Sequence, residues 1–82
     1  PMVGITDKSG TAGIAYWVNA FFKIPASEKV TKDNDGVKAI KALVDKEYES
    51  TRIIGISDEE MIAFTKKELP DIFKKYEKNI RG

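Results

Sequence analysis

A polar turn followed at once by an amphipathic segment is the feature that most constrains how this chain folds. The dipeptide Ser9-Gly10 gives the turn signal, and the segment after it runs to about Phe22. The apolar residues of this segment fall at the i, i+3, i+4, i+7 spacing of one helical stripe: Ile14, Trp17, Val18 and Phe21. Since Ser and Thr are preferred at helix N-caps, we expect Ser9 or Thr11 to cap this helix.

Further helices follow along the chain. The stretch from about residue 35 to residue 50 keeps its apolar residues on one stripe: Val37, Ile40, Val44 and Tyr48. Ser57 and Glu60 form a capping box, and the helix that it starts turns four residues towards the core: Met61, Ile62, Phe64 and Leu69. Pro70 either kinks that helix or begins a last one, which presents Ile72, Phe73 and Tyr76.

These patterns predict an all-α fold, with three to four short helices in a small bundle-like unit. Residues 1–8 are expected as an entering arm, either a short N-terminal strand or extended chain, and residues 51–56 as an extended connector or a very short strand. A length of 82 residues suits a single helical domain. Because the chain begins with Pro1 and not with Met, we expect either a removed initiator methionine or a piece of a longer protein.

Composition narrows the functional classes. The net charge is only +1, from 14 basic and 13 acidic residues, which argues against a dedicated nucleic-acid-binding protein. The chain has no cysteine and no histidine, so it lacks disulfides, the usual zinc ligands and the commonest general base. A reducing cytoplasm is the expected location, and no apolar run is long enough to span a membrane. We expect no catalytic residue and no metal site in this chain.

The turn before the first helix is a candidate contact for an anion. Lys8-Ser9 invites comparison with a phosphate-binding loop, but Asp7 and Met2 occupy the places of the required glycines. A weaker possibility is that backbone N–H groups at the start of the helix hold an anion. The candidate residues are Lys8, Ser9, Gly10 and Thr11. The alternative is that the hydroxyl groups only satisfy the helix's own free N–H groups.

Two acidic segments are better explained by helix capping than by ligand binding. If Gly36 is aligned with the invariant glycine of a calcium loop, Ala42 falls where the bidentate glutamate is needed. Residues 33–36 therefore predict a cap and a turn. The acids at 58–60 fit the first turn of a helix, where they complement the helix dipole.

Four aromatic residues crowd into one short helix. They are Tyr16, Trp17, Phe21 and Phe22, which is more ring surface than a small bundle can bury along one helix. Some of them are expected to face a partner domain or a second copy of the chain, because exposed aromatic patches mark contact surfaces. Lysines gather between Lys66 and Arg81, but acids are interleaved among them, so a solvated helical face is favoured over a patch that follows phosphates.

Taken together, these segments resemble a known family. Val3-Gly4, the run from Lys8 to Gly13, the charged stretch Val44–Tyr48 and the helix start Ile56–Glu60 occur here in that order. They resemble the region just after the catalytic barrel of isopropylmalate, homocitrate and citramalate synthases, over about residues 3 to 68. The chain departs from the family at Lys8, where the family often has His. It also has extra residues at 5–7 and an apparent inserted loop at 24–35.

The resemblance implies a role without catalysis in this segment. Such synthases condense acetyl-CoA with a 2-oxo acid on a metal-dependent (β/α)₈ barrel, and their catalytic acids and divalent metal lie mainly upstream. The implied role is an accessory subdomain of an acyltransferase of the amino-acid-biosynthesis type. This subdomain would pack on the barrel of its own or a partner chain, with homodimerisation expected, and shape the active site. The 2-oxo acid is left open.

Two alternatives to this role remain. The first is a free-standing helical protein that binds another protein through the Trp17/Phe21 face. The second is a weak nucleic-acid binder that uses the segment from Lys66 to Arg81.

Overall fold

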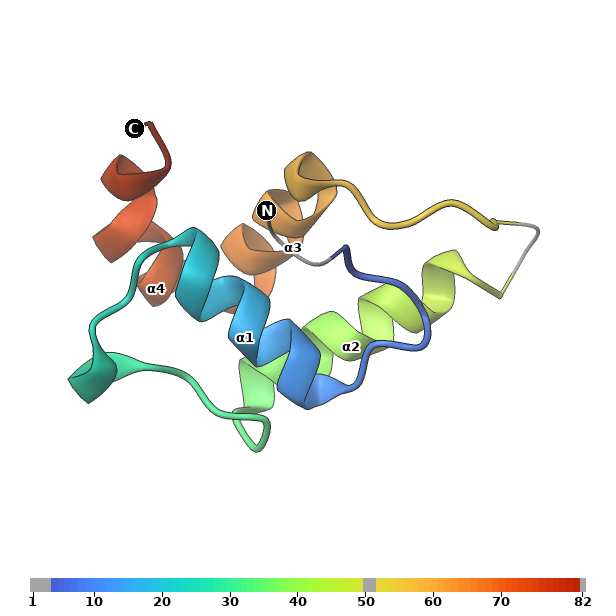
Figure 1. Ribbon diagram of the computed structural model, residues 1–82, viewed down its shortest axis with the longest axis horizontal. Coiled ribbons are helices and arrows are strands. Elements are labelled where there is room, and N and C mark those ends of the chain that lie inside the picture. Colours follow the sequence, from blue (N-terminus) through green and yellow to red (C-terminus); the bar gives the residue numbers. More distant parts are fainter. Residues whose placement is uncertain (1–3, 50–51, 82) are drawn as a thin grey trace.

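The computed structural model describes residues 4–49 and 52–81, and these residues form a small all-α bundle. The helices are α1 (Thr11–Phe21), α2 (Asp35–Glu47), α3 (Asp58–Glu68) and α4 (Pro70–Tyr76). Short 3₁₀ turns follow α1, as η1 (Ala26–Glu28), and α4, as η2 (Glu77–Arg81). Helices α1 and α2 cross each other, α3 lies beside them, and α4 closes one end of the bundle (Figure 1). The predicted fold class is confirmed.

The N-terminal arm meets the connector before α3 at a single point. Ile5 and Ile56 form an isolated antiparallel bridge, in which the Ile56 N–H donates to the Ile5 carbonyl oxygen at 2.7 Å. Both side chains are buried. The described part of the arm is therefore held by one bridge and ends in a turn at residues 7 and 8, and no longer ladder forms among the described residues. Residues 1–3 and residues 50 and 51 lie outside the described part.

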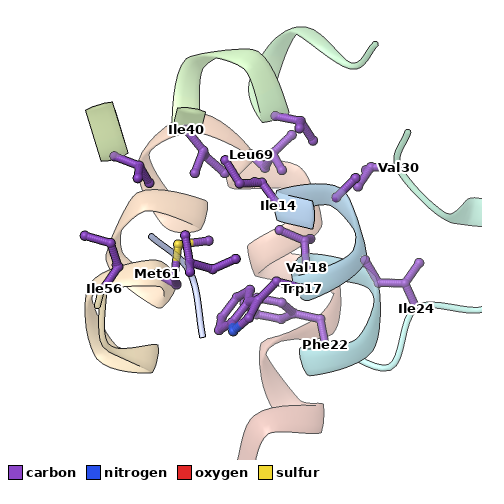
Figure 2. Packing of buried hydrophobic residues seen from close by; sticks show 14 of the residues in the cluster. Ile14, Trp17, Val18, Phe22, Ile24, Val30, Ile40, Ile56, Met61 and Leu69 are labelled. Atoms are coloured by element: carbon purple, nitrogen blue, oxygen red, sulfur yellow. The ribbon is translucent and has the colours of Figure 1, made fainter. Parts of the chain in front are cut away.

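The core is built from one face of each helix and from two residues of the α1–α2 connector. Figure 2 shows the α1 side chains pointing towards α2 and the α3–α4 region, with Ile24 and Val30 closing the side next to the connector. Side chains with no exposed surface include Ile14, Val18, Phe22, Val37, Ile40, Val44 and Met61. The predicted stripes of the first two helices are confirmed except at their last positions. Phe21 is only half-buried and its neighbour Phe22 takes the core position, while Tyr48 is half-buried and lies just after the end of α2.

Local chemistry explains where most helices begin and end. Asn34 caps α2, since its side-chain oxygen accepts from the Gly36 N–H at 2.7 Å and from the Val37 N–H at 3.1 Å. The predicted capping box of Ser57 and Glu60 is present at the start of α3. Pro70 begins α4 as its first residue, which settles the two readings of that proline in favour of a new helix.

Helix α1 ends in a Schellman motif without a glycine. Lys23 adopts a left-handed conformation with φ of 54°, and its N–H donates to the Ala20 carbonyl at 3.3 Å. The next N–H, that of Ile24, reaches back to the Asn19 carbonyl at 3.0 Å. This turn redirects the chain so that Ile24 is buried.

Gly36 lets α2 approach the α3–α4 junction. A Cβ atom at this position would lie 2.8 Å from the Glu68 carbonyl oxygen and would also overlap the Leu69 side chain. Thr65 is buried although the apolar stripes did not predict it. Its hydroxyl can lie inside the molecule because it donates to the Met61 carbonyl at 2.8 Å, four residues earlier. Among the described residues, no helix has the length and apolar content needed to cross a membrane.

Candidate functional site

The turn before α1 is closed by hydrogen bonds of its own. The Ser9 hydroxyl accepts from the Thr6 N–H at 3.1 Å, while the Ser9 N–H donates to the Thr6 carbonyl at 3.0 Å. The N-cap of α1 is Gly10, and no side chain caps it. The prediction that Ser9 or Thr11 caps the helix is therefore wrong, because the Ser9 hydroxyl is used within the preceding turn.

The four candidate residues for anion contact lie together at this end of α1. Lys8 and Gly10 are exposed, whereas Ser9 and Thr11 are half-buried. Lys41 of α2 ties the turn down, since its ammonium donates to the Asp7 carbonyl at 3.1 Å. Nothing at the turn identifies a ligand, so the anion contact stays a prediction.

The aromatic residues of α1 divide between the core and the surface. Trp17 is only 2% exposed and stacks on Phe21, with ring centroids 4.5 Å apart and planes 10° from parallel. Phe22 meets both rings edge-on, and across the bundle it meets Phe73 of α4 at 6.1 Å. Tyr16 points away from this cluster and is 63% exposed. The interface prediction stays a prediction, and on this chain its exposed surface comes from Tyr16 and the half-buried Phe21.

A polar contact fixes the aromatic cluster to α3. The Trp17 indole N–H donates to a carboxylate oxygen of Asp58 at 3.3 Å. Asp58 is the first residue of α3, so the same acid also lies at the positive end of the helix dipole. Two of the three acids at 58–60 thus have structural partners, Trp17 for Asp58 and Arg52 with the Ser57 N–H for Glu60.

A shallow groove of about 300 Å³ opens beside the exposed Tyr16. It is lined by Tyr16, Asn19, Ala20, Lys23, Ile24 and Lys29. Both polar atoms of the Asn19 side chain are already used, since they bond the N–H and the carbonyl of Val30 at 2.9 Å each. The groove therefore offers a ring and two surface ammonium groups, but no buried polar group free to select a ligand.

The most organised polar cluster surrounds Arg52, a residue that the sequence patterns did not single out. Its guanidinium makes a two-pronged contact with Glu60, at 2.6 Å and 2.7 Å, and a further bond to Glu47 at 2.9 Å. It also donates to the carbonyls of Ile54 at 3.1 Å and Gly55 at 2.8 Å. One side chain thereby joins the end of α2, the start of α3 and the connector between them.

The same cluster fixes the charge of its acid. The Arg52 guanidinium, helped by the Ser57 N–H, lowers the pKa of Glu60 from 4.5 to about 2. Glu60, in turn, is the main cause of a raised pKa for Arg52. Tyr48 adds a hydroxyl bond to the Ile54 carbonyl, and its ring lies 5.8 Å from the guanidinium carbon.

This cluster holds two isoleucines out in solvent. Ile53 is 91% exposed and Ile54 is 69% exposed, while the next apolar residue along the chain, Ile56, is buried. In Figure 1 the connector that carries them projects away from the bundle, between the end of α2 and the start of α3. The sequence signal for this feature was an arginine inside a β-branched run, between two acid-rich helix ends.

A second charged cluster joins α4 to the 3₁₀ turn η1. Lys75 of α4 pairs with Glu28 at 2.7 Å, and the Tyr76 hydroxyl also donates to Glu28. These contacts lower the pKa of Glu28, with Lys75 as the largest cause. Within residues 4–49 and 52–81, no three His, Cys, Asp or Glu side chains converge, so the residues present do not fit a divalent metal.

Comparison with known proteins identifies relatives over most of the chain. A citrate (Re)-synthase of Syntrophus aciditrophicus is 44% identical over 69 residues, which cover 84% of this chain and 11% of that protein. A citrate (Re)-synthase of Clostridium kluyveri is 33% identical over 76 residues, which cover 93% of this chain and 17% of that protein. The chain is similar to citrate (Re)-synthases. No family model and no solved structure matches it.

The relatives support the resemblance to the synthase family at a coarse level. Citrate (Re)-synthases belong to the same superfamily as the isopropylmalate, homocitrate and citramalate synthases. The chain spans between about a tenth and a sixth of the length of the relatives it matches. It corresponds in size to a small segment of such a condensing enzyme.

Proposed function

We propose that this chain is a helical accessory segment of a citrate-forming synthase of the citrate (Re)-synthase type. The observation that carries the proposal is the 44% identity over 69 residues to one such enzyme, supported by a second relative over 93% of the chain. Identity of this extent across a continuous segment reflects common descent and a shared fold. The segment's own side chains then act by packing and positioning, without chemistry of their own.

The citrate in the relatives' names supports oxaloacetate as the 2-oxo acid, which the sequence left open. Citrate contains the atoms of oxaloacetate plus those of acetic acid, so condensation of acetyl-CoA with oxaloacetate, followed by hydrolytic loss of CoA with one water molecule, balances the atoms. Acetyl-CoA and a divalent metal would be held by the rest of the parent enzyme, because the described residues of this chain do not fit a metal. The contribution of the chain is a rigid helical unit with one fixed connector.

The proposal is tested first by reading the gene around this segment. We expect an upstream coding stretch of about 250 residues or more, enough for a (β/α)₈ barrel, with a His-x-His pair suited to a metal. The encoded full polypeptide should form citrate from acetyl-CoA and oxaloacetate in the presence of a divalent cation. A stop codon directly before this segment, or a full polypeptide that forms no citrate, would overturn the proposal.

A matched pair of variants tests the accessory role itself. Deleting residues 11–81 from the full polypeptide should abolish citrate formation. The exchange of exposed Lys67 for Glu, on the outer face of α3, should leave citrate formation unchanged. Full activity of the deletion variant would show that the segment has no role in the reaction.

A further inference from the structure

We infer that the Ile53–Ile54 loop is a docking element, whose two side chains insert into an apolar pocket with a basic rim on the remainder of the parent synthase. This inference rests on the proposed function, because it takes its partner from the same polypeptide. The loop is defined here as residues 52–55. Its partner is identified by chemistry alone: an apolar depression surrounded by Lys or Arg side chains.

The loop is both exposed to solvent and fixed in position. Two adjacent large aliphatic side chains at 91% and 69% exposure stand out, because the other large aliphatic residues in the described part of the chain are at least partly buried. Flexible connectors lose entropy when they bind, whereas this loop is already fixed by Arg52 through Glu60 and two carbonyls. A preorganised apolar tip of this kind is suited to inserting into a pocket.

The second argument is the charge around the tip. Between residues 45 and 60 the chain has six acidic and only two basic residues, and one of these bases, Arg52, is committed to its own acids. The flanking ends of α2 and α3 carry exposed acids, Glu47 and Glu59 among them. Complementary charge is how interfaces select partners and orientation, so the receiving pocket has a basic rim.

Two other partners for the isoleucine tip fit less well, a second copy of the chain and a membrane. A stable interface between separate molecules buries about 800 Å² on each partner, far more than two isoleucine side chains supply. A contact within one polypeptide does not have to hold two molecules together, so this small area suits an intrachain partner better than a second copy. Anionic lipid surfaces attract basic segments and would repel this acidic one. The remaining occupant is the larger part of the synthase, since the matched segment makes up only 11% or 17% of the relatives.

Hydrogen exchange on the full polypeptide tests the inference. The amides of residues 53–55 should exchange at least about tenfold more slowly in the full polypeptide than in the isolated 82-residue chain, because docking removes them from solvent. The double variant Ile53→Ser/Ile54→Ser should lose this protection in the full polypeptide. The control Tyr16→Ser, at another exposed apolar residue, should keep it.

The outcomes separate this inference from the proposed function. If the full polypeptide forms citrate but residues 53–55 exchange as in the isolated chain, the docking inference is overturned and the proposed function stands. If the isolated chain forms a dimer that the double variant abolishes, the occupant is a second copy. If the isolated chain binds phosphatidylserine vesicles through the two isoleucines, the occupant is a membrane. Either of these last two results overturns the inference as stated.

Discussion

The rings of α1 lie inside the molecule, whereas the two isoleucines of the α2–α3 connector lie outside it. Trp17 and Phe22 expose 2% and 0% of their surface, while Ile53 exposes 91%. The rings are held by other apolar groups, including Phe73 of α4. The isoleucines are held by polar groups of the backbone and of Arg52.

This difference shows two uses of apolar surface in one small chain. The aromatic cluster stabilises the fold, since burial of such side chains removes the most apolar area from water. In the connector, polar interactions hold apolar side chains in solvent, and these side chains add nothing to the folding free energy through burial. Surface that is displayed at such a cost points to binding, and surface that is buried points to stability.

The largest effect is expected when the aromatic cluster is cut. Phe22→Ala should lower the free energy of unfolding by about 3–5 kcal/mol, because it removes a fully buried ring and leaves a cavity. The matched exchange Ile53→Ala should change it by less than about 0.5 kcal/mol, because that side chain already lies in water. Urea unfolding followed by circular dichroism measures both. Equal decreases in the free energy of unfolding at the two positions would contradict the distinction between the buried ring and the exposed isoleucine.

A second change strains the core side without removing apolar area. Gly36→Ala should destabilise the chain by about 1–3 kcal/mol, because the new methyl group collides with Leu69 and with the Glu68 carbonyl. Gly13→Ala is the matched control inside α1, where the nearest atom, Ser9 Cβ, lies at an ordinary 3.7 Å. This control should stabilise the chain by about 0.5–1 kcal/mol through helix propensity. Thermal unfolding of the two variants should therefore shift in opposite directions.

The helices could be predicted from the sequence because their signals are local. The spacing of Val37, Ile40 and Val44 sets one face of a helix, and the capping box at Ser57 needs only the residue three positions later. The error over Phe21 and Phe22 arose at a helix end, where the period of 3.6 no longer applies. There the edge-on contact with Phe73, about fifty residues away, decides which ring is buried.

The candidate site was harder to predict because it depends on the meeting of distant groups. No local pattern shows that Glu47 and Glu60, on different helices, converge on one guanidinium. Residues 51–56 fit an extended connector, and the described part of that stretch is one, but its period says nothing about which isoleucine faces solvent. Ile56 is buried because it pairs with Ile5, which lies about fifty residues earlier in the chain.

Removing the polar contacts of Arg52 should speed hydrogen exchange in the connector more than in the core. Arg52→Ala removes the contacts to Glu60 and to the Ile54 and Gly55 carbonyls, so the Ile56 amide, which is bonded to the Ile5 carbonyl, should exchange on the order of tenfold faster in the isolated chain. Arg52→Lys should not restore slow exchange, because an ammonium group cannot reproduce the two-pronged contact. Amides in the middle of α1 serve as the internal reference. Unchanged exchange in the connector would mean that the arginine does not order it.

The smallest effect separates the two regions by pH. The pKa of Glu60 is about 2 in the folded chain against 4.5 for an unperturbed carboxyl group, so as the pH falls the unfolded chain takes up this proton first. The stabilisation from Glu60 is thus complete above about pH 5 and is lost between pH 4.5 and pH 2. Its size is about 1 kcal/mol at most, since the side chain is 35% exposed and solvent screens the pair.

The variant Glu60→Gln isolates this contribution. Glutamine retains the shape of the side chain and its capping-box bond to the Ser57 N–H, but it does not titrate. The difference in unfolding free energy between the original chain and Glu60→Gln should therefore shrink as the pH is lowered from 5 to 2. The same pH-dependent difference in unfolding free energy should be seen in the Phe22→Ala background. The two substitutions are in separate clusters, so their effects should add. A difference that stays constant over this pH range would show that the guanidinium does not hold the carboxylate in its charged form, and the connector would then owe its order to Tyr48 and the bridge at Ile56.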